Sequence, residues 1–188
     1  MAVTYSRVLL KVSGEALSGS KGAGFDEATI ASICAGIRKA HDLGTQIAIV
    51  VGGGNFWRGR SSGRMDRMDA DKICMLATVM NAIAVKDALR QAGVPAVVMT
   101  GIVMPQVAEV FTSDKAIRAL EQGTVVVFGG GTGNPIFSTD TASALRALEI
   151  GADAMLKATM VDGVYNKDPH KYPDAVRYQT LTFTRVLE

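Results

Sequence analysis

The segment Phe128 to Asp140, FGGGTGNPIFSTD, contains the residue types best suited to binding a phosphate group. An apolar run, Val125 to Phe128, stops there at three glycines, and a polar stretch then leads into a helical pattern. Glycine can adopt backbone angles that are closed to residues with a Cβ, so main-chain N–H groups can approach an anion closely. Ser138, Thr139 or Asp140 can cap the helix, whose N-terminus favours negative charge. We therefore predict a cradle for a nucleotide phosphate in this segment.

Two further glycine clusters also follow apolar runs. VVGGGN covers Val50 to Asn55, and KVSGEALSGSKGAG covers Lys11 to Gly24. For any single cluster, the alternative is a tight turn of an α/β protein without a ligand. Ligands of open parallel sheets gather at the carboxyl ends of the strands, so three clusters at predicted strand ends favour a polyphosphate site.

Lys11 and Arg58 are the candidate phosphate-binding cations. Lys11 lies at the end of the first apolar run, where its ammonium can neutralise charge on a phosphoryl group during transfer. Arg58 follows a glycine turn, and its planar guanidinium suits a bidentate contact with phosphate. The alternative for each is a solvent-exposed charge, and this alternative weighs more for Arg58.

Asp71 and Asp140 are the candidate carboxylates. Asp71, near the start of a long helical pattern, can accept hydrogen bonds from ribose hydroxyls or merely favour the helix dipole. Asp140 can orient a lysine or cap a helix, and the spacing alone favours the cap. Trp57 is expected to be a packing residue.

Several catalytic motifs are missing from the sequence. It has neither GxxxxGK[ST] nor the HRD and DFG motifs of protein kinases, and His41 and His170 have no suitable metal partners in the sequence. No base is placed for a hydrolytic triad. A phosphate monoester, with a second pKa of about 6, is already an anion at neutral pH and needs no base to act as an acceptor. The scarcity of bases therefore favours a kinase that acts on a nucleoside monophosphate.

The elements that must position these residues are predicted from alternating apolar runs and helical patterns. Short apolar runs rich in β-branched residues predict strands buried on both faces. Helical patterns, each followed by glycine, separate them and predict a parallel sheet with helices on both faces. The strands are Arg7 to Val12, Gln46 to Val51, Ala96 to Thr100, Thr124 to Phe128 and Asp153 to Ala158, and the helices are Asp26 to Leu43, Asp69 to Ala92, Ser113 to Gln122 and Thr139 to Ile150.

The remaining segments are predicted to be irregular. Phe56 to Met68 is expected to be a mobile surface loop, and Val161 to Ala175 a loop stiffened by two prolines. Thr182 to Glu188 is typical of a helix that has just begun, which suggests a missing continuation.

Composition sets limits on the class of protein. The 188 residues suit one domain, perhaps with a small appended lobe, and 20 Lys and Arg against 18 Asp and Glu are too balanced to indicate nucleic-acid binding. No apolar run approaches the length of a membrane span, and no signal peptide is predicted. Cys34 and Cys74 lack metal-site spacing and are expected to be reduced thiols, which favours the cytoplasm.

Five segments in order along the chain resemble the bacterial uridylate kinase (UMP kinase) family of the amino-acid kinase superfamily. They are LLKVSGEAL, VVGGGNFWRG, MLATVMN, GTGNPIFSTD and KATMVDGVYNKDP, and the resemblance runs from Arg7 to Glu188. It implies a three-layer αβα sandwich with a mostly parallel central sheet. It also implies transfer of the γ-phosphoryl group of ATP to UMP in pyrimidine biosynthesis, with Mg²⁺, in a cytoplasmic homohexamer activated by GTP and inhibited by UTP.

The resemblance also implies roles for individual residues. Lys11, Arg58 and Asp140 would be catalytic, and no metal ligand is assigned. The ATP-binding residues would be Lys11, Val12, Ser13, Gly14, Gly54, Arg58, Thr159, Tyr165 and Asp168. The UMP-binding residues would be Gly53, Asp71, Thr132, Gly133, Asn134, Pro135, Ile136, Phe137, Ser138 and Thr139. The region matched to allosteric GTP comprises Gly19, Ser20, Lys21, Gly22, Ala23 and Gly24.

The sequence departs from the family pattern at three places. Cys74 stands where the family usually has glycine, and Met160 replaces a common lysine. The chain also stops before a Met-Asp motif, so residues 1–188 are expected to form a single kinase-like domain that lacks its C-terminal part. Two alternatives remain open: a nucleotide-binding regulatory domain without turnover, and another small-molecule kinase of the same superfamily.

Overall fold

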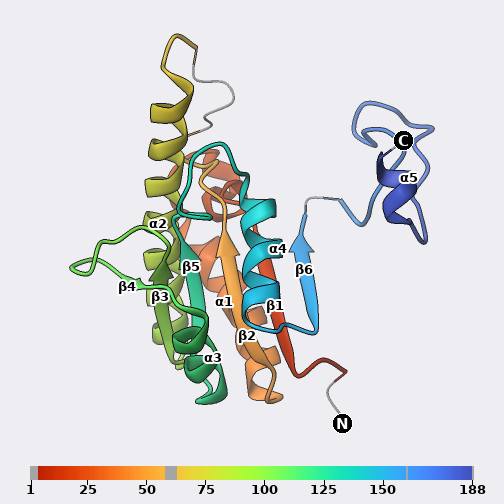
Figure 1. The fold of residues 1–188 in the computed structure, drawn as a ribbon. Coiled ribbons are helices and arrows are strands. Elements are labelled where there is room, and N and C mark those ends of the chain that lie inside the picture. Colours follow the sequence, from red (N-terminus) through yellow and green to blue (C-terminus); the bar gives the residue numbers. More distant parts are fainter. Residues whose placement is uncertain (1–3, 58–62, 160, 188) are drawn as a thin grey trace. The chain divides into compact units, whose positions relative to one another are not determined.

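The computed structural model describes residues 4–57, 63–159 and 161–187. The chain divides into two compact units, Met1–Ala158 and Thr159–Glu188. The first unit is a parallel sheet with helices on both of its faces (Figure 1). Within the described residues no helix has both the length and the apolar character that are needed to cross a bilayer.

The sheet of the first unit has six strands in the order β4-β3-β5-β2-β1-β6, and every neighbouring pair is parallel. Because all the strands point the same way, their carboxyl ends lie at the same end of the sheet (Figure 1). The strands are β1 (Arg7–Val12), β2 (Gln46–Val51), β3 (Ala96–Thr100), β4 (Glu109–Val110), β5 (Val125–Gly129) and β6 (Ala154–Ala158).

The long helices begin at side-chain caps. Asp26, Asp66, Thr112 and Ser138 each accept a hydrogen bond from a backbone N–H of the first turn, which satisfies a donor that the helix itself leaves unpaired. The helices are α1 (Glu27–Asp42), α2 (Arg67–Gln91), α3 (Ser113–Glu121) and α4 (Thr139–Glu149).

Two hydrophobic cores lie on opposite faces of the sheet. In β1, Val8 belongs to the core that α1 and α2 cover, whereas Leu9 belongs to the core that α3 and α4 cover. The same alternation occurs in β2, where Ile49 and Val50 face opposite cores. This period of two is the geometry of a strand, and burial on both faces explains the continuous apolar runs. The predicted three-layer αβα sandwich is thus confirmed.

Several predicted boundaries are wrong. α2 begins at Arg67, behind the cap Asp66, so the predicted loop from Phe56 to Met68 extends two residues too far. β5 lies one residue further along the chain than predicted, and β6 starts one residue later. The two-residue strand β4 and the 3₁₀ helix η1 (Glu15–Lys21) were not predicted.

The prediction of a strand buried on both faces is wrong for β6. β6 lies at one end of the strand order and pairs only with β1 among the described strands, and Leu156 is 46% exposed. The edge strand β6 has an apolar run like that of a central strand, because Met155 and Leu156 are adjacent apolar residues. Sequence pattern therefore does not report the position of this strand in the sheet.

The second unit has little regular structure. Tyr165 and Arg177 form an isolated antiparallel bridge, and the Arg177 guanidinium pairs with Asp162 at 2.7 Å. The short helix α5 (Phe183–Leu187) follows, in the segment where a helix was predicted to begin.

Candidate active site

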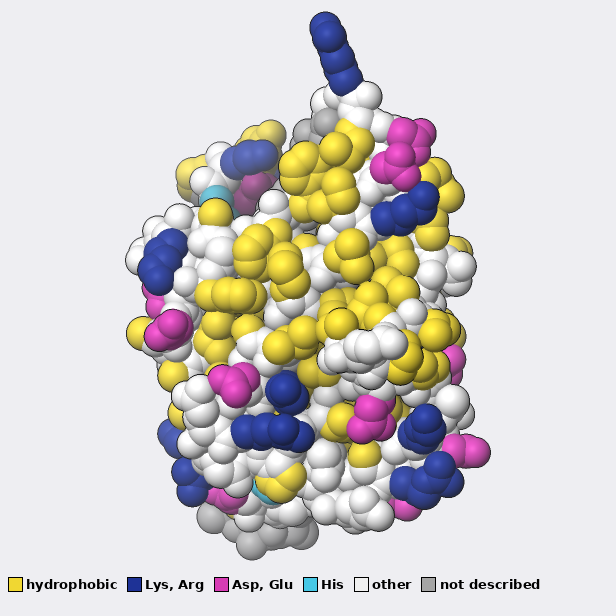
Figure 2. All heavy atoms as spheres, turned by 90° about the vertical axis from the view of Figure 1, so that its left-hand side faces the viewer, with side chains coloured by type: hydrophobic (Ala, Val, Ile, Leu, Met, Phe, Trp, Pro, Cys, Tyr) yellow, Lys and Arg dark blue, Asp and Glu magenta, His cyan; other side chains and the backbone are white. Residues whose placement is uncertain are grey.

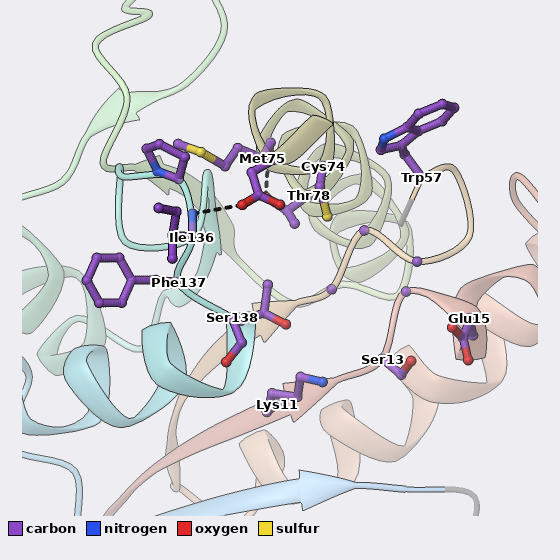
Figure 3. Close-up of a pocket in the computed structure, with 18 of the residues that line it drawn as sticks. Lys11, Ser13, Glu15, Trp57, Cys74, Met75, Thr78, Ile136, Phe137 and Ser138 are labelled. Carbon is purple, nitrogen blue, oxygen red and sulfur yellow. Dashed lines mark hydrogen bonds between the residues drawn. The ribbon is translucent and has the colours of Figure 1, made fainter. Parts of the chain in front are cut away.

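A cavity of about 340 Å³ opens at the carboxyl ends of the strands in the first unit (Figure 3). The loops that follow β1, β2 and β5 line it together with the first turns of α2. Of the residues that the sequence singled out, the cavity brings together Lys11, Ser13, Gly14, Gly53, Gly54, Asp71, Pro135, Ile136, Phe137, Ser138 and Thr139. Three separate glycine clusters thus contribute to one site, as their positions after predicted strands indicated.

The loops after β1 and β2 are in direct backbone contact, which explains their glycines. A Cβ placed on Gly14 would lie 2.6 Å from the Gly52 carbonyl oxygen and 2.7 Å from the Gly54 nitrogen. A Cβ on Gly53 would lie 2.8 Å from the Cys74 carbonyl oxygen of α2. These distances are shorter than a carbon atom tolerates, so no other residue fits without moving the backbone. The glycines bring the two loops and α2 together as one wall of the cavity.

A buried pair of asparagines fixes this wall, and the sequence analysis did not identify it. The side-chain amide of Asn81, in α2, donates to the Gly52 backbone carbonyl at 2.6 Å and to Oδ1 of Asn55 at 2.7 Å. Asn55 in turn donates to Asn81 at 3.0 Å and to the Gly24 carbonyl at 2.8 Å. Buried amides need such partners. Asn81 ends the MLATVMN segment, so the motif itself was the available signal.

Two lysines and one aspartate form the charged part of the site. Lys11 is only 8% exposed, and its Nζ lies 3.1 Å from Oδ1 of Asp140. Lys157, on β6, lies 2.8 Å from Oδ2 of the same carboxylate. Lys11 and Lys157 are register partners in the parallel pairing of β1 with β6, so both side chains leave the same face of the sheet. The sequence analysis missed Lys157, and only the pairing of the two strands reveals it.

Asp140 stays ionised because of these lysines. Burial alone would raise the pKa of its carboxyl, but the ion pairs with Lys157 and Lys11 outweigh it and lower the pKa below its ordinary value. The prediction that Asp140 caps the helix is wrong. Ser138 is the cap, and its hydroxyl accepts from the Thr141 N–H at 3.1 Å. Asp140, two residues further on, has its carboxylate directed to the lysines instead, which is the other role that the sequence left open.

Asp71 lies on the opposite wall and is 8% exposed. Its Oδ2 accepts a hydrogen bond from Nε of Arg67 and another from the Ile136 N–H, both at 2.9 Å. The bond at Ile136 is drawn as a dashed line in Figure 3. Among the described residues, Ile136 is the one non-glycine residue with a positive φ, at 76°. This conformation costs a β-branched residue on the order of 1 to 3 kcal/mol. The bond to Asp71 holds the strained residue in place and so closes the loop against α2.

Some predicted residues do not line this cavity. Val12 is buried in β1, and the stretch from Gly19 to Gly24 spans the end of η1 and the turn after it. Thr132, Gly133 and Asn134 lie in the loop after β5 but outside the lining of the cavity, with the Thr132 hydroxyl bonded to the Asn134 backbone.

Five further residues are outside the first unit or outside the described residues. The structure places Thr159, Tyr165 and Asp168 in the second unit, where the Tyr165 hydroxyl donates to Asp162 at 2.6 Å. Arg58 and Met160 lie outside the described residues.

The two cysteines have different environments. Cys34 is buried in the core between α1 and α2, and this burial raises the pKa of its thiol to about 11. It is therefore protonated and unreactive at neutral pH. Cys74 lines the cavity beside Gly53.

Ammonium groups and the backbone N–H groups of glycine loops are donors that suit phosphate. No cluster of three or more His, Cys, Asp or Glu side chains that could hold a metal ion occurs in the described ranges. The carboxylate of Asp140 is already shared by two lysines. Since Mg²⁺ in kinases is held largely by substrate phosphates and water, these residues fit an ion that arrives with the nucleotide.

Comparisons with known proteins agree with this geometry. The model of the amino acid kinase family matches residues 6–188. The crystal structure of UMP kinase from Bacillus anthracis has a TM-score of 0.92 and 37% identity, over 97% of this chain and 77% of that chain. UMP kinase from Ureaplasma parvum has a TM-score of 0.91 and 33% identity, over 98% and 80%. An isopentenyl phosphate kinase substrate complex shares the fold, with a TM-score of 0.68 and 23% identity, over 91% and 76%.

Proposed function

The chain belongs to the amino acid kinase family. We propose that it transfers the γ-phosphoryl group of ATP to UMP, giving ADP and UDP. The observation that carries the proposal is the group of Lys11, Lys157 and Asp140 beside a cavity walled by glycine loops. The similarity to the two UMP kinases at 37% and 33% identity supports UMP as the acceptor.

The two lysines supply positive charge where a phosphoryl group would carry negative charge. Asp140 neutralises one of the two ammonium groups and keeps both fixed, so the group has a net charge of about +1 by counting formal charges. Preorganised charge of this kind stabilises a transition state without further rearrangement. We assign Lys11 and Lys157 to the transferring phosphoryl group and Asp140 to the positioning of both.

No general base is required. An oxygen of the UMP phosphate attacks the γ-phosphorus, the bond from that phosphorus to the bridging oxygen breaks, and ADP leaves with the electron pair. The acceptor oxygen carries no proton at neutral pH. This agrees with Asp140, whose lowered pKa makes it a poor base.

The glycine loops after β1 and β2 are proposed to bind ATP. Ser13, Gly14 and Gly54 line the cavity next to Lys11, and their backbone N–H groups can serve the phosphates. Mg²⁺ bound with the nucleotide would neutralise charge on the phosphates. We propose Arg58 for the phosphates as well, and Thr159, Tyr165 and Asp168 for the adenine nucleoside.

The opposite wall is proposed to bind UMP. The segment from Pro135 to Thr139 lines the cavity beside Gly53 and Asp71. Oδ1 of Asp71 accepts no hydrogen bond from the residues that the structure describes, and it can accept from ribose hydroxyls. We propose the remainder of the stretch, from Thr132 to Asn134, for the uracil edge.

We also propose a homohexamer regulated by GTP, through the stretch from Gly19 to Gly24, and by UTP. Figure 2 shows hydrophobic side chains gathered on the face of the first unit that carries α2. Ile73, Leu76 and Met80, spaced along one side of α2, are 39%, 50% and 44% exposed. An exposed apolar face of this kind suits contact with a further copy of the chain.

The direct test is UDP formation from ATP and UMP, with CMP, carbamate and acidic amino acids as competing acceptors. We expect UMP to be strongly preferred. Binding of UMP without any UDP would instead indicate a regulatory nucleotide-binding domain, and transfer to another acceptor would indicate a different kinase of the family.

The variant Asp71→Asn tests the acceptor side. One hydrogen bond to the ribose can survive in the amide, so we expect a partial loss on the order of 1.5 to 3 kcal/mol. This should raise KM for UMP, leave KM for ATP nearly unchanged and reduce the preference for UMP over 2′-deoxy-UMP. Asp69→Asn is the matched control, since Asp69 lies on the same helix and forms an ion pair with Lys72 at the exposed surface. Equal effects on ATP, UMP and 2′-deoxy-UMP would contradict the ribose assignment.

A further inference from the structure

Arg146 is a buried arginine that the proposed chemistry does not use. It lies on α4, is 4% exposed and does not line the cavity. Its guanidinium carbon is 4.0 Å from the centroid of the Phe111 ring, and Nη1 pairs with Glu149 at 2.5 Å. Burying a guanidinium costs free energy unless its N–H donors and its flat faces have partners. The contacts with Glu149 and Phe111 supply such partners and indicate that Arg146 has a specific structural role.

Arg146 also contacts the start of the loop after β5. Nη2 of Arg146 donates to the Gly131 carbonyl at 3.4 Å, next to the stretch proposed to bind UMP. The guanidinium therefore contacts the loop without lining the cavity. Cavity-lining side chains and Arg146 thus bind the same loop.

The backbone around this contact is closely packed. A Cβ on Gly101, just after β3, would lie 3.1 Å from Nη2 of Arg146 and 3.3 Å from the Gly133 nitrogen. A Cβ on Gly133 would lie 2.9 Å from the Gly101 carbonyl oxygen. Gly131 thus contacts the guanidinium, and Gly133 contacts the residue that follows β3. A shift of Arg146 would therefore be transmitted to Gly131.

Among the residues that the structure describes, three side chains outside the loop form hydrogen bonds with it. The Gly130 N–H donates to the Thr78 hydroxyl at 2.8 Å, and the Ile136 N–H donates to Asp71 at 2.9 Å. Arg146 supplies the third contact, at Gly131, from a side chain that does not line the cavity. Fixing the loop in advance removes the ordering cost that binding would otherwise carry.

We propose that Arg146 is a positioning residue for the loop after β5, residues 130–137, which contains residues proposed to bind the acceptor UMP. It acts through the Gly131 carbonyl and through its packing against Phe111. The role in UMP binding rests on the proposed function, whereas the effect on loop order does not. Because the fork of an arginine can contact Glu149 and Gly131 at once, lysine should not replace it.

The experiment compares Arg146→Lys with Glu149→Gln. The lysine variant keeps the positive charge but loses the planar fork and its stacking on Phe111. The glutamine variant weakens the ion pair and leaves the guanidinium on Phe111 and Gly131. In Arg146→Lys we expect faster hydrogen–deuterium exchange confined to residues 130–137 of the ligand-free protein. We also expect about a tenfold rise in KM for UMP, the effect of a lost bond to a charged group, with KM for ATP within about twofold.

Glu149→Gln should stay close to the unsubstituted protein in both measurements. If the two variants speed up exchange equally, or if the lysine variant speeds it up throughout α4 and the sheet, Arg146 is only a packing residue and the proposal is wrong. Phe111→Leu is the second variant should Arg146→Lys not fold, and it should show the same loop-confined pattern at smaller size.

The two proposals can fail separately. An unsubstituted protein that forms no UDP and binds no UMP would refute the proposed function, and exchange in the ligand-free variants would still decide the role of Arg146. Trp57 is the only tryptophan in the sequence and lines the cavity, so its fluorescence reports UMP binding directly in every variant.

Discussion

Lys11, Lys157 and Asp140 depend on one another, because a single carboxylate holds both ammonium groups. Removing Asp140 would leave two like charges side by side on neighbouring strands, and removing either lysine would leave the other with a carboxylate to itself. Each substitution in this group therefore changes more than one charge contact. Variants have to be compared by which step they affect, and not only by how much activity they lose.

Lys11→Ala should abolish transfer while leaving UMP binding nearly intact. Loss of a charge contact made mainly in the transition state is worth ~3 to 4 kcal/mol, so kcat should fall by about two orders of magnitude or more. Steady-state kinetics and a UMP titration followed through Trp57 measure the two effects. Lys72→Ala, which removes an exposed lysine of α2, is the control and should leave both unchanged. An unaltered kcat in Lys11→Ala would exclude Lys11 from the mechanism.

Asp140→Asn should reveal how acid weakens the site. The folded-state pKa of Asp140 is lowered, so its ion pairs stabilise the protein above the ordinary carboxyl pKa of about 3.9. This stabilisation disappears as the pH falls through the lower folded-state value. The difference in Tm between the unsubstituted protein and Asp140→Asn should thus be largest near neutral pH and shrink in acid.

Asp153→Asn is the control for this pH dependence. Backbone N–H groups of Arg7 and Ser6 lower the pKa of Asp153, at the end of the sheet opposite to the cavity. We expect the same acid-dependent loss of the Tm difference, but unchanged UDP formation. A Tm difference for Asp140→Asn that does not vary with pH would show that the carboxylate is not held as described.

At the scale of the elements, the loops after β1 and β2 should be far less tolerant than the helices behind them. Gly14→Ala would place a carbon 2.6 Å from the Gly52 carbonyl, so the two loops must separate. We expect lower stability and a raised KM for ATP. Gly36→Ala, in α1, meets no atom within 4 Å and should stabilise the protein by about 0.5 to 1 kcal/mol through helix propensity. Equal behaviour of the two variants in melting and kinetic measurements would contradict the close approach of the loops.

The predictable part of the fold is the part set by local pattern. The bounds of β1, β2 and β3 follow directly from their apolar runs, and Asp26 caps α1 as its position before the helical pattern indicated. The convergence of three glycine clusters on one cavity was also predictable, because parallel strands end at a common edge.

The missed parts depend on pairing and tertiary contact. β4 is two residues long and exists only through its pairing with β3, which no local pattern encodes. Lys157 joins the site because β6 pairs with β1 in a particular register. The positive φ of Ile136 reflects its bond to Asp71, 65 positions away in sequence, and nothing around Ile136 in the sequence indicates it.

At the scale of the whole chain, UMP should stabilise the first unit against heating. At a ligand concentration of about 100 times Kd, binding adds about 2.7 kcal/mol to the free energy of unfolding. For a domain of this size, that corresponds to a rise in Tm of roughly 5 to 10 °C. Uridine at the same concentration should give a much smaller shift, because it lacks the phosphate. Equal shifts with UMP and uridine, measured by calorimetry, would contradict phosphate recognition in the cavity.

The parallel sheet also separates two surfaces of the first unit. Substitutions at the amino ends of the strands should leave the cavity unchanged, whereas substitutions at the carboxyl ends alter it. The cavity lies at the carboxyl ends of the strands, whereas the turns at Gly44, Gly93, Gly123 and Gly151 return α1, α2, α3 and α4 to the amino ends. Gly44, Gly93 and Gly123 have positive φ angles of 88°, 82° and 74°, so these glycines should be kept although no atom lies within 4 Å of where a Cβ would stand. A fluorescent label or a short peptide tag placed at a residue beside one of these glycines would lie remote from the nucleotides. A change of acceptor specificity, in contrast, would require substitutions in the loops at the carboxyl ends of the strands, which line the cavity.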